Sequence, residues 1–166
     1  SNDYRTIEQT MEKLPGGTRR LAAQLTTSAS FDSLWNVLTD YDRLNIYIPN
    51  LLSSKKIYQK NNNVHLKQVG AQDFLGMKFS AEVTIDLFED KELGLLKFSL
   101  IKGDFRKFEG SWKIQNIKDT SKNSLIYDLT VQGCQWMPIG MIEKRLKKDL
   151  SENLIAVDRQ AKLSIN

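Results

Sequence analysis

A long amphipathic stretch near the C-terminal end, residues 138–164, most constrains what this chain can fold into. Its apolar residues recur at steps of three and four, which places them on one face of a helix. Charged residues such as Glu143, Arg145 and Asp149 fill the positions between them and predict a solvent-facing side. At about 1.5 Å per residue, this helix would be about 35–40 Å long. Its apolar face therefore needs a large partner surface, and it consists of Ile139, Ile142, Leu146, Leu150, Leu154, Val157 and Ala161.

Most of the preceding chain predicts β-strands that would supply this surface. Apolar and polar residues alternate without interruption from Phe79 to Leu87, as in a strand with one buried face. Short turns connect the strands, so successive strands should be antiparallel neighbours. The predicted strands are 18–27, 53–59, 64–72, 78–87, 93–101, 107–115 and 125–131, of which the poorly patterned 53–59 suits a sheet edge.

Two short helices are predicted between the first and second strands. Apolar spacing indicates a helix over 31–39 with Ser30 as its N-cap, and Pro49 ends a second helical turn that starts at Asp40. The fold class is therefore α+β, with a curved antiparallel sheet of about seven strands wrapped around the long C-terminal helix. We expect residues 1–17 to form an N-terminal arm and 18–164 a single domain.

Composition excludes several kinds of chemistry. The chain has 166 residues, 40% hydrophobic and 27% charged, as in a soluble globular domain. Cys134 is the only cysteine and His65 the only histidine, so an internal disulfide and a Cys/His zinc site are excluded. We expect no metal and no cofactor. His65 should face outward from its strand, Cys134 should be a small buried residue, and Asp40 and Asp42 should be helix-end caps rather than an acid–base pair.

No apolar run is long enough to cross a membrane, so we expect a cytoplasmic protein that is at most peripheral to a membrane. Because the sequence begins with Ser1 rather than Met, a removed targeting segment stays an open alternative. The net charge is +4, and basic residues gather on the charged side of the long helix. This surface is typical of a solvated face and is also compatible with an anionic membrane. It consists of Lys144, Arg145, Lys147 and Lys148, with Lys55, Lys56, Arg19 and Arg20 elsewhere, and its lack of interleaved aromatic residues argues against nucleic acid.

Several segments resemble a known family. They are VLTDYDRL at 37–44, YIPNL at 47–51, GDF at 103–105, FEGSW at 108–112 and LSENL at 150–154. Together with the element order, they resemble the polyketide cyclase/dehydrase and coenzyme Q-binding START-domain family in the form found in cyanobacteria and plastids. The resemblance covers about 18–162 and implies the START-like (SRPBCC) helix-grip fold. It also implies a hydrophobic pocket between sheet and helix. Some relatives carry quinones, some are aromatase/cyclases, and one bacterial branch is linked to ribosomes.

The inward-facing residues are the candidate lining of this pocket, although they could equally pack a solid core. Gly110 lies on an inward strand face, where it either leaves space or marks a bend in the sheet. Apolar residues at two turns could form the entrance or close the end of the core: Phe74, Leu75 and Phe105. The candidate ligand-binding residues are Trp35, Phe79, Val83, Phe98, Phe108, Trp112, Tyr127, Leu129, Ile142, Leu146 and Leu150.

The resemblance and the candidate lining together favour binding or transport of a hydrophobic small molecule, such as a lipid, quinone or isoprenoid-like compound. Tyr127 is the single candidate for catalysis, because it alone combines an inward strand position with a hydroxyl group. A polyketide cyclase or dehydratase using the same pocket is the first alternative. A module that interacts with proteins or the ribosome through its basic surface is the second. An apolar lining would suit a carrier, whereas convergent polar groups would suit a cyclase.

Overall fold

The computed structural model describes residues 7–137 and 139–164, except for the side chains at 72, 74, 139, 141 and 142. Three α-helices span Phe31–Leu38 (α1), Leu44–Tyr47 (α2) and Ile139–Leu163 (α3), with short 3-10 turns at Pro15–Gly17 and Tyr41–Arg43. The predicted long helix is confirmed from Ile139 onward, and Pro138 lies outside the described residues. The strands are β1 (Glu8–Lys13), β2 (Arg19–Thr27), β3 (Leu51–Lys60), β4 (Asn63–Phe74), β5 (Met77–Asp90), β6 (Leu95–Gly103), β7 (Phe105–Asn116) and β8 (Asn123–Gly133).

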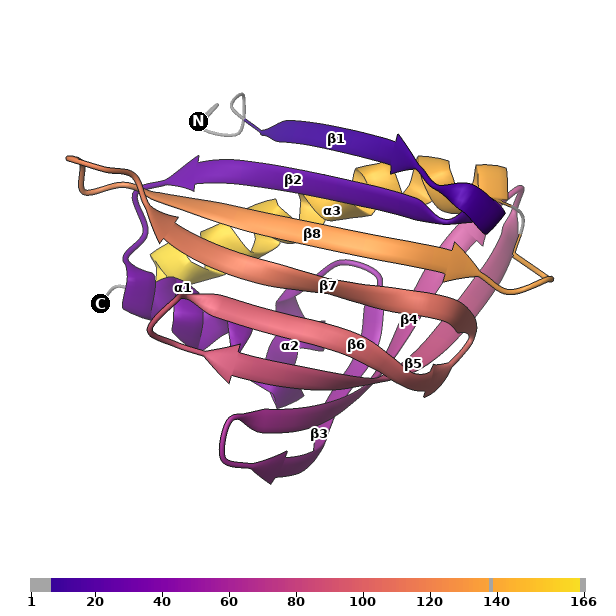
Figure 1. Cartoon of the computed structure of the whole chain (residues 1–166), viewed down its shortest axis with the longest axis horizontal. Helices are drawn as coiled ribbons and strands as arrows, with labels where there is room; N and C mark the ends of the chain where they lie inside the picture. The colour runs from indigo at the N-terminus through magenta and orange to yellow at the C-terminus, as the bar shows by residue number, and fades with distance from the viewer. Residues whose placement is uncertain (1–6, 138, 165–166) are drawn as a thin grey trace.

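The strands form one antiparallel sheet in the order β1-β2-β8-β7-β6-β5-β4-β3, and its concave side holds α3 (Figure 1). This is the helix-grip architecture. The sheet has eight strands rather than the predicted seven, because the N-terminal arm contributes β1 as an edge strand. Met11 of β1 lies opposite Leu21 of β2 and packs partly against the core, while most other β1 side chains are exposed. The opposite edge is β3, as its weak pattern predicted.

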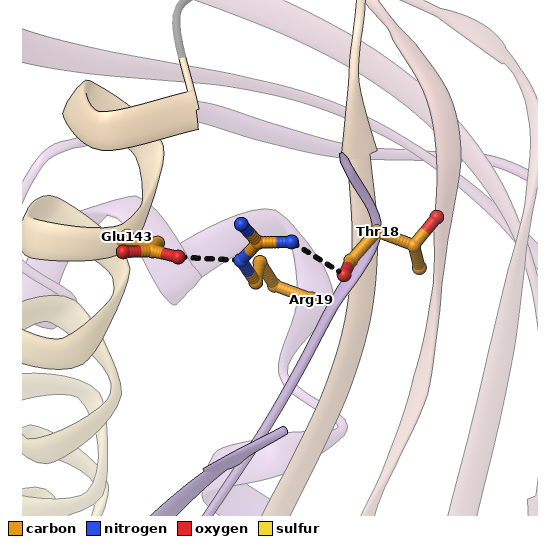
Figure 2. Close-up of polar contacts among 3 residues, drawn as sticks. All are labelled: Thr18, Arg19 and Glu143. Atoms are coloured by element: carbon orange, nitrogen blue, oxygen red, sulfur yellow. Dashed lines mark hydrogen bonds and ion pairs between the residues drawn. The ribbon is translucent and has the colours of Figure 1, made fainter. Parts of the chain in front are cut away.

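Polar contacts attach α3 to β2 at both of its ends. Toward the C-terminal end, the buried carboxylate of Asp158 accepts a hydrogen bond from the hydroxyl of Thr27, and Lys162 Nζ lies 3.1 Å from Asp158 Oδ2. Near the N-terminal end, Arg19 Nε donates to Glu143 Oε1 at 2.5 Å and Arg19 Nη1 donates to the carbonyl of Thr18 at 3.0 Å (Figure 2). The helix is therefore fixed above the sheet on both sides of its central turns.

A solid core fills the end of the fold where α1 packs against α3. Ser30 is the N-cap of α1, as predicted, and its Oγ accepts a hydrogen bond from the backbone N–H of Ser33 at 3.1 Å. Trp35 of α1 is 6% exposed and stacks on Phe31, with ring centroids 5.9 Å apart. Fully buried aliphatic residues complete this core, among them Leu25, Leu34, Leu125, Leu154 and Val157.

The segment 73–77, which contains the predicted entrance residues Phe74 and Leu75, forms a tight hairpin between β4 and β5. Leu75 and Gly76 form its turn, with φ values of 51° and 77°. Positive φ at both central residues is typical of a type I′ turn, which matches the twist of the two strands. The side chain of Leu75 is 86% exposed at this turn.

Gly110 of β7 marks a close approach of two strands rather than a void. A Cβ atom at this position would lie 1.9 Å from the carbonyl oxygen of Asp128 in β8. Glycine is therefore needed so that the two backbones can come together here. This close approach argues against the explanation that Gly110 leaves space.

Candidate ligand-binding site

A cavity of about 220 Å³ lies between the sheet and the N-terminal half of α3, at the end of the fold opposite α1. Residues of α2 and the following loop, β4, β5, β7, β8 and α3 line it. The attachment of Glu143 to Arg19 holds the first turns of α3 next to this cavity. Most lining residues are apolar: Leu44, Ile48, Pro49, Leu51, Gly70, Ala71, Phe79, Ala81, Val83, Phe105, Phe108, Trp112, Leu129, Trp136, Met137, Leu146 and Leu150.

The structure brings many of the candidate binding residues together in this lining. They are Phe79, Val83, Phe108, Trp112, Tyr127, Leu129, Leu146 and Leu150. Trp35 and Phe98 are not in the lining, since Trp35 packs beside Phe31 in the solid core and Phe98 is 5% exposed behind Phe108. The side chain of Ile142 lies outside the described residues. We therefore leave Trp35 and Phe98 out of the site.

Aromatic residues of β7 and β8 form one wall of the cavity. Trp112 and Tyr127 lie opposite each other in the strand register, and their rings stack with centroids 4.1 Å apart and an interplanar angle of 8°. Phe108 contacts Phe105, with ring centroids 5.3 Å apart. Because these rings support one another, the wall is a broad and rigid apolar surface.

Polar side chains also reach the cavity, and they are Asn50, Gln68, Ser80, Tyr127, Asp149 and Asn153. Gln68 is engaged with the sheet, since its Nε2 donates to Ser54 Oγ at 3.2 Å. Asp149 and Asn153 come from α3, where the sequence pattern placed Asp149 on the solvent-facing side. That expectation is wrong, because Asp149 lies three residues after Leu146 and one before Leu150 and shares their face. The same spacing could have identified it from sequence.

Asp149 is the one carboxylate among the described residues that line the cavity. Its pKa is raised to about 6, chiefly by burial and also by the charge of Glu152, against the opposing effects of Arg145, Asn50 and Lys148. Arg145 Nε lies 3.4 Å from Asp149 Oδ1. Both atoms are enclosed, and neither makes a hydrogen bond within the described part of the chain. The ion pair thus orients the carboxylate but does not supply all the hydrogen bonds that a buried carboxylate needs.

Tyr127 presents a neutral hydroxyl to the same region. Burial raises its pKa above the usual value, and the nearby charge of Asp149 adds to this rise. The hydroxyl therefore stays protonated at neutral pH and can donate a hydrogen bond. Tyr127 and Asp149 together supply a donor and an acceptor on adjoining walls of the cavity.

Exposed apolar side chains stand around the open end of the cavity. Trp136, in the loop before α3, lines the cavity and is 49% exposed, and Phe105 lines it from the start of β7. Leu75 and Met77, which is 62% exposed, lie farther out along the β4–β5 hairpin and do not line the cavity. The side chain of Phe74 lies outside the described residues. Of the two predicted entrance residues whose side chains are described, Phe105 borders the cavity and Leu75 does not.

The remaining reactive residues lie away from this cavity. His65 faces outward, with Nε2 3.3 Å from Asp86 Oδ1 and its ring stacked on Tyr58. Cys134 is half-buried. Asp42 Oδ1 accepts a hydrogen bond from the backbone N–H of Lys56 at 2.8 Å, which ties the helical turn to β3. In the described residues, no three His, Cys, Asp or Glu side chains gather so that they could hold a metal ion.

No helix in the described part of the chain is long and apolar enough to cross a membrane.

Comparison with known proteins gives a family match and a set of similar structures. A family described as polyketide cyclase/dehydrase and lipid transport matches residues 27–158. No curated protein matches the chain.

Three solved structures illustrate the structural likeness. A STAR-related lipid transfer protein from Xanthomonas axonopodis is 12% identical, with a TM-score of 0.81 over 98% of this chain and 97% of that chain. An aromatase/cyclase from a Streptomyces species is 15% identical, with a TM-score of 0.75 over 90% and 96% of the two chains. A protein from Thermus thermophilus is 16% identical, with a TM-score of 0.75 over 89% and 99%. At these identities the likeness establishes a shared fold.

Proposed function

Because this chain belongs to the polyketide cyclase/dehydrase and lipid transport family, we propose that it binds and carries a hydrophobic small molecule in the cavity beneath α3. The observation that carries this proposal is the cavity itself, which is predominantly apolar and has the stacked rings of Trp112 and Tyr127 on one wall. Apolar walls with a few polar groups are the usual makeup of small-molecule sites. The lipid-transfer description of the Xanthomonas protein is in keeping with this role.

The size of the cavity limits the part of the ligand that is enclosed. An apolar cavity of about 150 Å³ holds one benzene molecule. A cavity of about 220 Å³ can therefore hold two fused rings or a short branched chain. A longer quinone-, isoprenoid- or lipid-like molecule would leave the rest of its chain near Trp136 at the open end.

A titration with 2-methoxynaphthalene tests the proposal, because this neutral probe has two fused rings and no hydrogen-bond donor. We expect saturable binding by isothermal calorimetry. Ala81→Phe should abolish binding, since Ala81 lines the cavity and the new ring would fill it. Ala22→Phe is the matched control because Ala22 is not a lining residue, and this variant should bind like the wild type. Absence of binding by the wild-type protein, or equal binding by a folded Ala81→Phe variant, would refute the proposal.

A cyclase or dehydratase is the second candidate, and the proximity of Tyr127 and Asp149 favours it. The ionised Asp149 would take an α-proton from the chain while the Tyr127 hydroxyl protonates the attacked ketone oxygen, so that a carbon–carbon bond and an alcohol form. Loss of a second proton and of the alcohol oxygen as water would then complete the dehydration. A synthetic poly-β-ketone thioester offered to the protein should then give a cyclised product that has lost water. The Tyr127→Phe variant should still bind 2-methoxynaphthalene but lose this product. Equal product formation without protein, or with Tyr127→Phe, would exclude Tyr127 as the acid.

Exchange of the ligand at an anionic membrane surface is a further part of the proposed role. Leu75, Met77 and Trp136 expose apolar area around the open end, and Lys144 and Lys148 are exposed on the first half of α3. Apolar side chains combined with nearby basic charge favour contact with anionic lipid. Co-sedimentation with phosphatidylserine vesicles should fall when Leu75 and Met77 are changed to Ser. Leu163→Ser, a change at an exposed leucine in the last turn of α3, should leave co-sedimentation unchanged.

A further inference from the structure

We propose that the ligand is a neutral molecule with a hydroxyl group, and that this hydroxyl donates a hydrogen bond to Asp149 inside the cavity. The inference rests on the proposed ligand-binding function and narrows its ligand class. It disfavours carboxylates and phosphates as the group that enters the cavity, and it disfavours ligands without any hydrogen-bond donor at that end.

The polar groups of the cavity converge on one region. Asp149 and Asn153 lie one turn apart on α3, Tyr127 reaches the region from β8, and Asn50 reaches it from the loop before β3. The charge of Asp149 acts on Tyr127, and the Asn50 side chain acts on Asp149, so these groups are electrostatic neighbours. The rest of the lining is mainly apolar. A ligand therefore meets one polar end and a long apolar wall.

Asp149 is positioned as the acceptor at that end. Its Oδ1 is enclosed next to Arg145 Nε, at 3.4 Å, and the side chain of Asn50 also hydrogen-bonds to the carboxylate. A carboxylate has about four acceptor positions, so it can still accept a hydrogen bond from a ligand. Arg145 itself does not line the cavity, so an entering molecule meets the negative charge rather than the positive one. An ionised carboxylate only accepts hydrogen bonds. A second anion would be repelled by this charge in a region of low polarity.

A ligand without a hydrogen-bond donor would bind more weakly. A ligand that displaces hydration from Asp149 without replacing its hydrogen bond loses affinity. A hydroxyl replaces that bond, and the same hydroxyl oxygen can accept a bond from the protonated Tyr127. The pairing of a carboxylate acceptor with a tyrosine donor therefore matches the two hydrogen-bonding roles of an alcohol or a phenol.

Three probes with the same ring system separate these contributions: 2-naphthol, 2-methoxynaphthalene and 2-naphthoate. Calorimetry at pH 8 keeps Asp149 ionised, because its pKa is about 6. We expect the wild-type protein to bind 2-naphthol about tenfold more tightly than 2-methoxynaphthalene, as for a hydrogen bond to a charged group. It should bind 2-naphthoate more weakly than either neutral probe.

Asp149→Asn removes the charge and keeps the size of the side chain. In this variant, the preference for 2-naphthol over 2-methoxynaphthalene should fall to about threefold or less, as for a hydrogen bond between neutral groups. The variant should also bind 2-naphthoate more tightly than the wild-type protein does. Glu152→Gln is the matched control, since Glu152 lies on the same helix but does not line the cavity. This control should keep the wild-type order of affinities.

The possible failures of the two proposals can be told apart. Equal wild-type affinities for 2-naphthol and 2-methoxynaphthalene, or an unchanged preference in Asp149→Asn, would overturn the assignment of Asp149 while leaving an apolar binding site. Binding of none of the three probes would overturn the binding function and this inference together. The wild-type comparison alone decides the matter if Asp149→Asn does not fold.

Discussion

Replacing Asp149 by Asn should stabilise the protein above pH 7, although the substitution removes one partner of an ion pair. Burial raises the pKa of Asp149 from 3.8 to about 6, which means that burial outweighs the attraction of Arg145. Between these pH values the folded protein keeps a proton that the unfolded chain releases. The free energy of unfolding therefore falls as the pH rises through this window and levels off above pH 6. The amide that replaces the carboxyl group does not ionise, so the free energy of unfolding of the variant does not fall in this way.

The size of the effect follows from the pKa difference. A change of one pKa unit is worth about 1.4 kcal/mol, so the rise from 3.8 to about 6 sets an upper limit of about 3 kcal/mol. The side chain of Asp149 is 18% exposed, and solvent screening reduces this figure. We expect the variant to be more stable than the wild type by about 1–2 kcal/mol at pH 8. At pH 4 the two proteins should be nearly equal, because Asp149 is then protonated in the folded state.

Urea unfolding followed by circular dichroism at pH values from 4 to 8 measures this difference. The stability gap between Asp149→Asn and the wild type should open as the pH passes from 4 to 6 and then stay constant. Glu152→Gln is the control for a change of charge on α3, and its gap should be smaller because the charge of Glu152 supplies only part of the rise in the pKa of Asp149. A variant that is less stable than the wild type at pH 8 would refute the reasoning, because attraction to Arg145 would then outweigh burial.

Two further substitutions test the packing around the cavity. Gly110→Ala should lower the free energy of unfolding by about 3 kcal/mol in urea titrations, because its Cβ would lie 1.9 Å from the carbonyl oxygen of Asp128. Gly140→Ala, where no atom lies within 4 Å of the added Cβ, is its control and should be neutral or slightly stabilising; equal costs would contradict the close-approach account. Leu154→Ala should cost about 2–5 kcal/mol in urea titrations and leave the affinity for 2-methoxynaphthalene unchanged, since Leu154 is fully buried away from the cavity. Leu150→Ala should enlarge the cavity and shift the preference of calorimetric binding toward larger ring systems, and an unchanged preference would place the ligand elsewhere.

Periodic segments of the sequence allowed the main elements to be predicted. Alternation from Phe79 to Leu87 identified β5, and the steps of three and four after residue 138 identified α3. These patterns are clear because each element buries one whole face, so its apolar residues recur at regular spacing. The Ser30 cap was also predictable, because capping depends on a few neighbouring residues.

Elements that bury little were harder to predict. Strand β1 contributes mainly Met11 to the core, so its sequence shows no alternation, and it was predicted only as an arm. The type of the β4–β5 turn was not predicted, because Leu75 is an unusual residue at positive φ, where Asn or Gly is more common. In both cases the pairing with a neighbouring strand decides the structure.

The candidate site was predicted in its apolar part and missed in its polar part. Strand alternation placed Phe108, Trp112 and Tyr127 on one inward face, and the structure brings them to the cavity wall. Asp149 was assigned to the solvent-facing side because it is charged, although its helical position between Leu146 and Leu150 points to the cavity. Trp35 was predicted to line the pocket but lies in the solid core. An inward residue lines a cavity only if no other side chain fills the space beside it. That depends on packing between distant segments.

Nuclear Overhauser contacts between bound 2-methoxynaphthalene and the leucine methyl groups of the protein test the central claim most directly. We expect contacts to Leu129, Leu146 and Leu150, which line the cavity beneath α3. We expect none to Leu25, Leu34 and Leu154, which belong to the solid core. Contacts confined to the exposed Leu75, or the absence of any contact at saturating probe, would contradict a ligand-binding cavity between the sheet and α3.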